Sequence, residues 1–300
     1  ARLTWQATPR NKIGFSYEPQ NRNWINALNA TFSPEMYQDW QFHREYFTSV
    51  SWTSPVTSRL LLDARFANHG EGFVDKYPEP GDPYRRAIPV RELSTGFLYR
   101  GKGYGSQPFS WFGTQEAPLI AQAHASVSYI TGSHALKFGF QNDFGGVTQE
   151  NFDNEYGLWY YFNNGVPTQI EQHALPFAQT TDVQADMGIY AQDRWTYKRA
   201  TINAGIRFDY FKSSFPEQHL GPASFVPNRN ITIPALDYNN LKDITPRVGV
   251  AYDLFGNSRT ALKASWGRYA ETWFTGFARR YNPMLAQNEA RTWSDTNNDD

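Results

Sequence analysis

The most regular feature of this chain is a set of segments in which apolar and polar residues alternate. Within 202–210, every second position is apolar and the positions between them hold polar residues or glycine: Ile202, Ala204, Ile206, Phe208 and Tyr210 against Asn203, Gly205, Arg207 and Asp209. Successive side chains of a β-strand point to opposite faces. The pattern therefore predicts a strand with one apolar face and one charged face.

Segments of this kind come in five pairs, and each pair is joined by a short turn. The predicted turns lie at 9–12, 54–58, 131–134, 197–200 and 256–259. Long polar stretches rich in aromatic residues separate one pair from the next. The chain therefore predicts about ten strands of 8–13 residues, arranged as antiparallel hairpins with short connections at one end and long loops at the other.

Two-faced strands with two unlike ends indicate an all-β fold, an antiparallel transmembrane β-barrel of the bacterial outer membrane. Strands of about 9–11 residues cross a hydrocarbon core when tilted. The alternatives are a soluble β-sandwich or propeller, but their loops are usually short at both ends. We expect the turns to face the periplasm and the loops to face outside. The loop 69–119 is predicted to carry short strands of its own, for instance around Leu93–Tyr99, and a second long loop spans 148–182.

Composition narrows the class of protein further. The 300 residues carry a net charge of -1 and include no cysteine, ten tryptophans, eighteen tyrosines and twenty-two phenylalanines. No run of about 18 apolar residues exists, which excludes transmembrane helices. No basic stripe appears, so a nucleic-acid partner is not expected. The aromatic content is typical of a barrel with aromatic girdles at the two membrane interfaces.

We expect the outer surface to contact outer-membrane lipid, with aromatic residues near strand ends lying at the membrane interfaces. The candidates for these positions are Trp52, Tyr129, Trp195, Tyr197, Tyr210 and Tyr252. Asp193 shares the apolar parity with Ile189 and Ala191. A charge on the lipid face is tolerated near an interface, where it costs about 0–1 kcal/mol, and Asp193 stands close to the predicted turn.

Charged residues repeat on the opposite, inward parity. They are Asp63, Arg65, Arg207, Asp209, Arg247 and Asp253. One interpretation is a wet barrel wall whose charges of both signs satisfy one another and contact a plug. The other is direct electrostatic contact with a substrate.

The long loops carry aromatic residues that could bind a ligand. Trp24, Trp40, Trp159, Tyr160 and Tyr161 are candidates for stacking on sugars or other flat apolar ligands. The alternative is that they pack the loops onto one another.

Metal and catalytic signals are weak. Asp295, Asn297 and Asp299 match the start of a calcium loop, but Asp300 replaces the glycine of the sharp turn, so a polar turn is the alternative. The six histidines lack zinc-ligand spacing, and no nucleophile or dinucleotide motif is present. We expect neither a cofactor nor enzyme activity.

The stretches 189–211 and 245–269 resemble the C-terminal half of TonB-dependent outer-membrane receptors, and are most similar to the Oar-like subfamily. The residues that carry the resemblance are Tyr190, Gln192, Asp193, Trp195, Gly205, Arg207, Asp209, Pro246, Arg247, Gly249, Tyr252, Asp253, Gly256, Lys263, Gly267 and Tyr269. Arg291, Trp293 and Asp295 match the following loop more weakly. The likeness is strong over 186–270, looser over 120–150 and mostly architectural before that.

The resemblance implies a barrel of 22 strands around a plug domain, with 1–300 as one partial barrel domain. The plug and the TonB box are expected upstream of residue 1, in a longer protein of which this chain is an internal piece. The implied function is active uptake of a scarce, bulky substrate, driven by TonB and its inner-membrane motor proteins. A small molecule, an oligosaccharide or a peptide all remain open as substrate. The alternatives are a plug-free porin and a barrel for surface adhesion or secretion.

Overall fold

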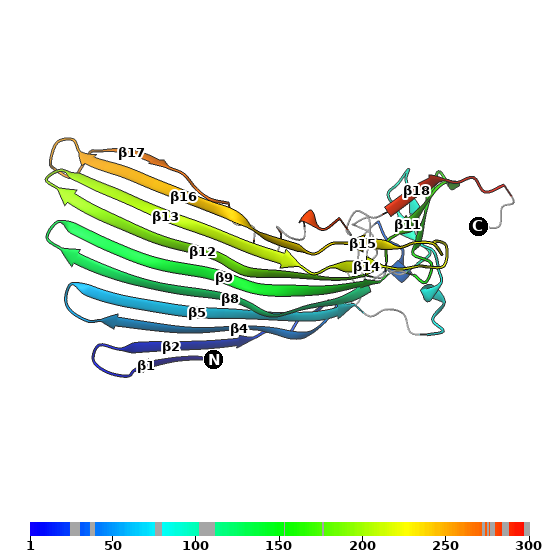
Figure 1. Ribbon diagram of the computed structural model, residues 1–300, viewed down its shortest axis with the longest axis horizontal. Coiled ribbons are helices and arrows are strands. Elements are labelled where there is room, and N and C mark those ends of the chain that lie inside the picture. The colour runs from blue at the N-terminus through cyan, green and yellow to red at the C-terminus, as the bar shows by residue number, and fades with distance from the viewer. Residues whose placement is uncertain are drawn as a thin grey trace.

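A computed structural model gives the fold, and it describes residues 1–24, 31–36, 40–75, 80–101, 112–152, 154–175, 177–271, 274, 276, 280–283 and 288–296. Its main feature is one large antiparallel sheet in which ten strands follow each other in chain order (Figure 1). These strands are β1 (Arg2–Gln6), β2 (Lys12–Pro19), β4 (Trp40–Pro55), β5 (Leu60–Asp75), β8 (Phe112–Thr131), β9 (His134–Phe152), β12 (Phe177–Tyr197), β13 (Ala200–Phe215), β16 (Leu236–Asp253) and β17 (Ala261–Gly267). An eleventh strand, β3 (Asn23–Trp24), pairs with β4.

The five predicted hairpins are confirmed, and their short turns all lie at one end of the sheet (Figure 1). In the fourth hairpin, Ile206 pairs with Ala191 and Arg207 pairs with Tyr190. Apolar side chains of neighbouring strands therefore share one face and polar side chains share the other, as a period of two requires. Each turn places strands that are adjacent in sequence next to each other.

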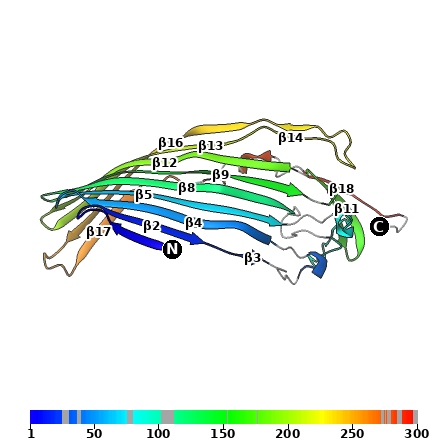
Figure 2. The same cartoon turned by 90° about the horizontal axis from the view of Figure 1, so that it is seen from below.

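The sheet is curved (Figure 2), and its two faces differ in exposure. On the apolar face, Phe138, Ile189 and Ile206 are 51–53% exposed. On the polar face, Ser126 is 7% exposed and Thr245 is fully buried. Side chains crowd together on the inside of a curved sheet and spread apart on the outside, so the polar face is the inner one.

Seven strands are longer than predicted, and this corrects the sequence analysis. They contain 16–21 residues, against the expected 8–13. In β13 the outward apolar series runs from Ile202 to Tyr210, about 26 Å at ~3.3 Å per residue. It then gives way to Lys212, although strand pairing continues to Phe215. Alternation thus marks only the lipid-facing part, and the paired wall extends beyond it.

The long loops build a second sheet of five strands at the far end (Figure 1). Its order is β18 (Asn288–Thr292), β11 (Val166–His173), β10 (Leu158–Asn163), β6 (Val90–Glu92) and β7 (Leu98–Tyr99). The prediction that the loop 69–119 carries short strands is confirmed by β6 and β7, but only β7 lies within Leu93–Tyr99, because a turn through Gly96 separates the two strands. The loop 148–182 likewise contains the β10–β11 hairpin. A third, two-stranded sheet pairs β14 (Gln218–Leu220) with β15 (Ile231–Ile233).

Hydrophobic cores occur mainly at the loop end. One cluster joins Phe32, Met36, Leu98 and Trp159, of which Met36 belongs to a short 3₁₀ turn, η1 (Pro34–Met36); a second such turn is η2 (Pro83–Arg85). Among the residues that the structure describes, no helix is both long and apolar enough to cross a membrane. In the same residues β1 and β17 are the two ends of the strand path, so the large sheet is open.

Candidate functional site

A polar network runs across the inner face from β4 to β12. The carboxylate of Asp63 accepts a hydrogen bond from Thr53 Oγ1 at 3.1 Å and one from Arg65 Nε at 3.1 Å. Its Oδ1 lies 3.7 Å from His124 Nδ1, and His124 Nε2 lies 3.4 Å from the Tyr190 hydroxyl. The predicted inward charges Asp63 and Arg65 are therefore engaged with each other and with neighbouring strands.

Two glycines allow large polar side chains to lie flat on this inner wall. The ring of Tyr190 crosses Gly139 of the adjacent strand, in the space that a Cβ atom would fill. The guanidinium of Arg207 occupies the same kind of space over Gly188. Any side chain at either glycine would displace the group above it. These glycines keep the network close to the backbone and leave the lumen side of the wall open.

The remaining inward charges are placed in three different ways. Arg207 Nε donates to Asp209 Oδ1 at 2.5 Å, and Thr245 Oγ1 donates to Asp209 Oδ2 at 3.2 Å. The Arg247 guanidinium lies 4.4 Å from the centre of the Tyr269 ring, a cation–π distance. Asp253 sits at the strand end, where its carboxylate accepts hydrogen bonds from the backbone N–H groups of Gly256 and Ser258. Those hydrogen bonds lower the pKa of Asp253, so its charge stabilises the turn.

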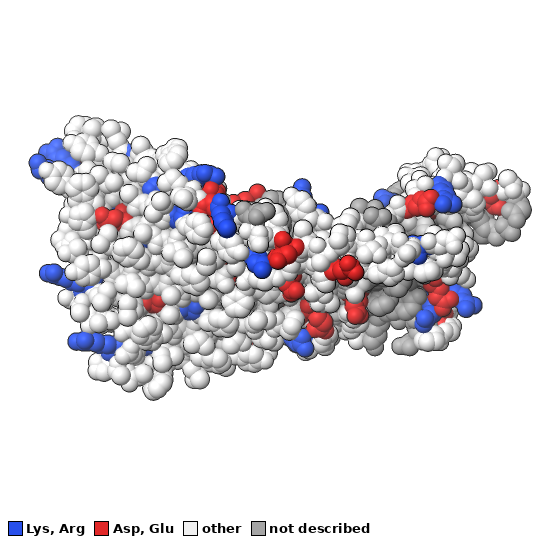
Figure 3. Space-filling view, in the orientation of Figure 1, with Lys and Arg blue, Asp and Glu red and all other residues white. Residues whose placement is uncertain are grey.

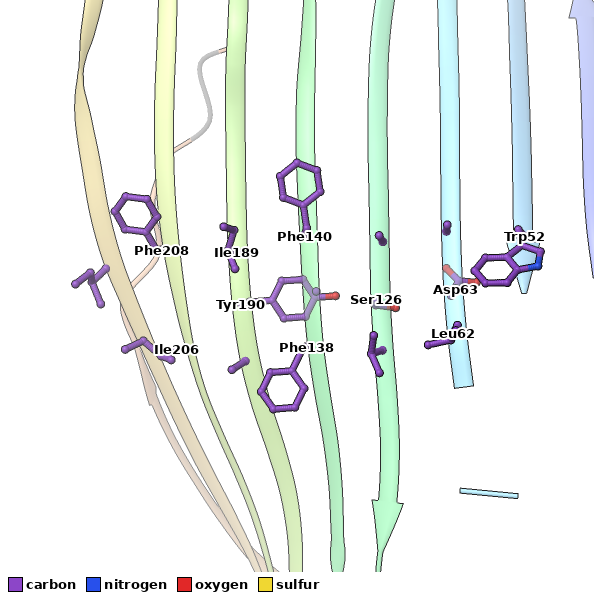
Figure 4. A pocket seen from close by; sticks show the side chains of 16 residues that line it. Trp52, Leu62, Asp63, Ser126, Phe138, Phe140, Ile189, Tyr190, Ile206 and Phe208 are labelled. Atoms are coloured by element: carbon purple, nitrogen blue, oxygen red, sulfur yellow. The ribbon is translucent and has the colours of Figure 1, made fainter. Parts of the chain in front are cut away.

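The outer face carries a wide apolar depression of about 630 Å³. Most of its lining side chains have the apolar parity and come from β4, β5, β8, β9, β12, β13 and β16 (Figure 4). The small residues Ala64 and Ala125 lie side by side between the larger Trp52 and Phe140. A hollow of this composition on the outer face suits lipid chains. It is not a site for a polar substrate.

The predicted girdle aromatics lie at both ends of the apolar band. Five are within three residues of a turn-side strand end: Trp52, Tyr129, Trp195, Tyr197 and Tyr252. Tyr210 lies ten positions beyond the start of β13, where Lys242 Nζ approaches its ring at 5.9 Å. The short turns also carry Arg10, Arg59, Lys198, Arg199 and Arg259. Basic side chains gather at this end of the molecule, next to a broad uncharged surface (Figure 3).

Asp193, the charge on the lipid parity, has a partner. Its Oδ2 lies 2.6 Å from His134 Nδ1, across the ladder between β12 and β9. The His134 ring stacks on Trp195 with a centroid distance of 5.6 Å. The pair stands near the turn end, where an aromatic interface layer is expected.

The candidate aromatics of the loops have structural contacts. Trp159 is 3% exposed, belongs to the loop core and stacks on His173. Tyr160 packs on Trp293 with centroids 4.4 Å apart, and the Tyr161 hydroxyl donates to Glu171. These three side chains hold the second sheet together.

Other candidates are only partly described. Trp24 and Trp40 are backbone partners in the β3–β4 ladder. Asp295 follows β18, but Asn297 and Asp299 lie outside the described residues. Within the described ranges no group of three or more His, Cys, Asp or Glu side chains is arranged to hold a metal ion.

The structure also shows a second hollow that sequence reasoning did not find. It measures about 490 Å³ and lies at the loop end between β11, the segment 225–231 and β18. We call it the loop cup. Its walls come from parts of the chain more than fifty residues apart, and no periodicity or motif links them.

Comparison with known proteins agrees with this architecture. The family described as "Outer membrane beta barrel domain" matches residues 1–299. A similar solved structure is the outer membrane transporter YddB from Escherichia coli, with 14% sequence identity and a TM-score of 0.52. That match covers 97% of this chain but 33% of the other, so this chain spans about a third of the transporter's length. No curated protein matches the chain.

At this identity the likeness to YddB shows the fold alone, and the family match extends over nearly the whole chain. The two findings agree with the two-faced sheet, its short turns and its long loops. They place the protein in the bacterial outer membrane. The chain belongs to the outer-membrane β-barrel domain family.

Proposed function

We propose that the chain is part of a TonB-dependent transporter of the Oar-like type, which takes up a scarce, bulky substrate through a plugged barrel. One observation carries this proposal: ten consecutive strands still leave the sheet open at β1 and β17. A closed barrel built on this sheet has more than ten strands, and among wide barrels those of 16–18 strands leave an aqueous channel whereas those of 22 strands hold a plug. The chain of the transporter YddB is about three times as long as this one, which supports a barrel with more strands than these ten.

The inner wall suits contact with a plug. Two pairs of opposite charge lie within the wall, Asp63 with Arg65 and Asp209 with Arg207. Each pair presents a polar surface without local net charge, against which a hydrated domain can move. The proposed partners are outer-membrane lipid, an upstream plug of the same protein, and TonB with its inner-membrane motor proteins. The protein is proposed to do no covalent chemistry.

The test is conductance of the purified full-length protein in planar lipid bilayers. A plugged transporter is closed, so we expect no steady current from the intact protein and large channels after deletion of the plug. Steady open channels from the intact protein would identify a plug-free porin instead.

A second measurement tests the coupling itself. We expect the full-length protein to bind the purified periplasmic domain of TonB, and to lose that binding when the TonB box is deleted. Absence of binding by the intact protein would contradict TonB dependence and favour an adhesion or secretion barrel.

A further inference from the structure

The loop cup has one strand for its floor and two separate walls. The floor is the end of β11, one wall is β18, and the other wall is the segment that precedes β15. In Figure 1, β11 and β18 lie together at the loop end, beside β14 and β15. The lining residues are Gln172, His173, Ala174, Phe225, Val226, Pro227, Asn228, Arg229, Ile231, Asn288, Glu289 and Arg291.

A half-buried cation lies in the cup. Among the residues that the structure describes, the Arg229 guanidinium has no carboxylate partner and donates to three backbone carbonyls, those of Gly221 at 2.7 Å, His173 at 3.3 Å and Leu175 at 3.2 Å. Burial lowers the pKa of Arg229, yet arginine stays charged in proteins. A guanidinium has five N–H donors, so two remain available. A positive charge in this setting favours an anionic group on whatever enters the cup.

The other two charged side chains of the cup have opposite signs and form an ion pair. Arg291 donates to the Glu289 carboxylate from Nε at 2.9 Å and from Nη2 at 2.7 Å, and both side chains are well exposed on β18. Counting these two with Arg229, the charged lining residues sum to one positive charge. The ligand should therefore carry one negative charge.

The floor and the β18 wall offer hydrogen-bond acceptors. Gln172 Nε2 donates to the backbone carbonyls of Tyr156 and Gly157, and Asn288 Nδ2 donates to Glu171 Oε1 at 2.7 Å. These bonds leave the side-chain oxygens of Gln172 and Asn288 buried without a donor. A buried acceptor without a donor destabilises the free protein. A ligand N–H that reaches either oxygen after a small rotation of the amide relieves that cost.

The wall opposite β18 is apolar. Phe225 is 59% exposed and its ring is held edge-on to Tyr156 with centroids 5.5 Å apart. Val226, Pro227 and Ile231 complete this wall. Such a surface suits an apolar side chain and disfavours a sugar, whose hydroxyl groups would face hydrocarbon.

We propose that the loop cup binds the carboxyl-terminal end of a short peptide. The terminal carboxylate pairs with Arg229, backbone N–H groups meet the oxygens of Gln172 and Asn288, and an apolar last side chain packs on Phe225. The proposal rests on the proposed function, because it makes a peptide the substrate that the transporter first captures outside the cell. The volume of about 490 Å³ suits two or three residues.

The test uses the purified full-length protein in detergent and isothermal titration calorimetry. The probe is the N-acetylated tripeptide Gly-Gly-Phe with a free carboxyl group, which carries one negative charge, compared with its C-terminal amide and with octanoate. We expect the free acid to bind at least tenfold more tightly than the amide, which lacks the charge, and than octanoate, which lacks N–H donors. Equal binding of acid and amide, no binding of the acid at millimolar concentration, or tighter binding of octanoate would overturn the proposal.

Variants locate the site. Arg229→Met should abolish the preference for the acid, but Arg229 also braces the loop through three carbonyls. Phe225→Ala changes an exposed side chain without that role and should weaken binding of the free acid at least fivefold. Arg59→Met, in a turn at the other end of the sheet, is the matched control and should bind like the parent. Unchanged binding by Phe225→Ala would place the peptide elsewhere.

This titration needs neither TonB nor a plug. Peptide binding together with an open channel in bilayers would refute plugged transport and leave the cup assignment standing. A closed, TonB-binding protein that ignores the peptide would refute only the cup.

Discussion

At the scale of single residues, the lipid-facing Asp193 shows how one side chain can make a charge acceptable at the membrane edge. Its carboxylate lies 2.6 Å from His134 Nδ1, and the His134 ring is fixed by stacking on Trp195. The strand parity that exposes Asp193 to lipid also places His134 of the neighbouring strand on the same face. Both residues stand near a turn, where the membrane environment is only partly apolar.

We predict that His134→Phe destabilises the barrel by about 1–2 kcal/mol, because a hydrogen bond to a charged group is worth about 1.5–3 kcal/mol and an exposed carboxylate recovers part of it from water. Phenylalanine retains a ring over Trp195, so the loss of stability measures the missing contact with the Asp193 carboxylate. The measurement is the urea midpoint of the full-length protein refolded into lipid vesicles. Adding Asp193→Asn to His134→Phe should restore most of the stability; a double variant no better than the single one would contradict this account.

At the scale of elements, the five hairpins could be predicted because two signals coincided. Alternation with period two identified the strands, and short turns such as 197–200 fixed which strands pair. The length of β12 and β13 could not be predicted, because pairing continues past Tyr210, where the outward residues turn polar and alternation no longer distinguishes strand from loop. The strands β10, β11 and β18 of the loop sheet could not be predicted for the same reason.

The loop cup was beyond sequence reasoning for a different cause. Arg229 and Asn288 are brought together by the packing of three segments, and neither residue belongs to a motif. The aromatic run that did stand out, Trp159 to Tyr161, proved to be packing within the loop sheet. Residues that are conspicuous in the sequence thus make the scaffold here, and inconspicuous ones line the hollow.

Glu92 joins two elements of the loop sheet and makes their contact sensitive to acid. Its carboxylate accepts hydrogen bonds from the backbone and hydroxyl of Ser94 and, across the sheet, from the N–H groups of Asn164 and Gly165 in the β10–β11 turn. The Ser94 hydroxyl, with the N–H of Gly165, lowers the pKa of Glu92 from 4.5 to about 2. A lowered folded-state pKa means that this contact stabilises the loop sheet above pH 4.5 and is lost as the pH falls from about 4.5 to about 2.

We predict that Glu92→Gln loosens the β6 and β10–β11 contact at pH 7 and has little further effect at pH 2. The measurement is limited proteolysis of the full-length protein, with trypsin at pH 7 and pepsin at pH 2. Cleavage after Arg91 should rise at least severalfold in the variant at pH 7, and at pH 2 parent and variant should be cut alike. Glu217→Gln, an exposed glutamate outside this sheet, is the control. Equal trypsin cleavage of parent and Glu92→Gln would contradict the role of Glu92.

At the scale of the whole molecule, the open sheet has two liabilities in water. Its edges at β1 and β17 present unpaired backbone donors and acceptors, the usual template for pairing with another chain. Its outer face exposes large apolar side chains, among them Trp5, Phe138, Ile206 and Trp266, each more than half exposed. In the membrane, lipid covers the apolar face, and in the proposed wider barrel further strands would pair with the edges.

We therefore predict that residues 1–300 alone do not form a stable monomer in detergent-free buffer. Both edges and the apolar band are then available for association. Each Å² of apolar surface that association removes from water stabilises the aggregate by about 25 cal/mol. The measurement is gel filtration with light scattering, followed by thermal melting. The full-length protein in detergent is the control and should elute as one folded species. A sharp monomeric peak of the 300-residue piece that melts cooperatively without detergent would show that this open sheet closes on itself, and both the wide barrel and the plug that it requires would lose their support.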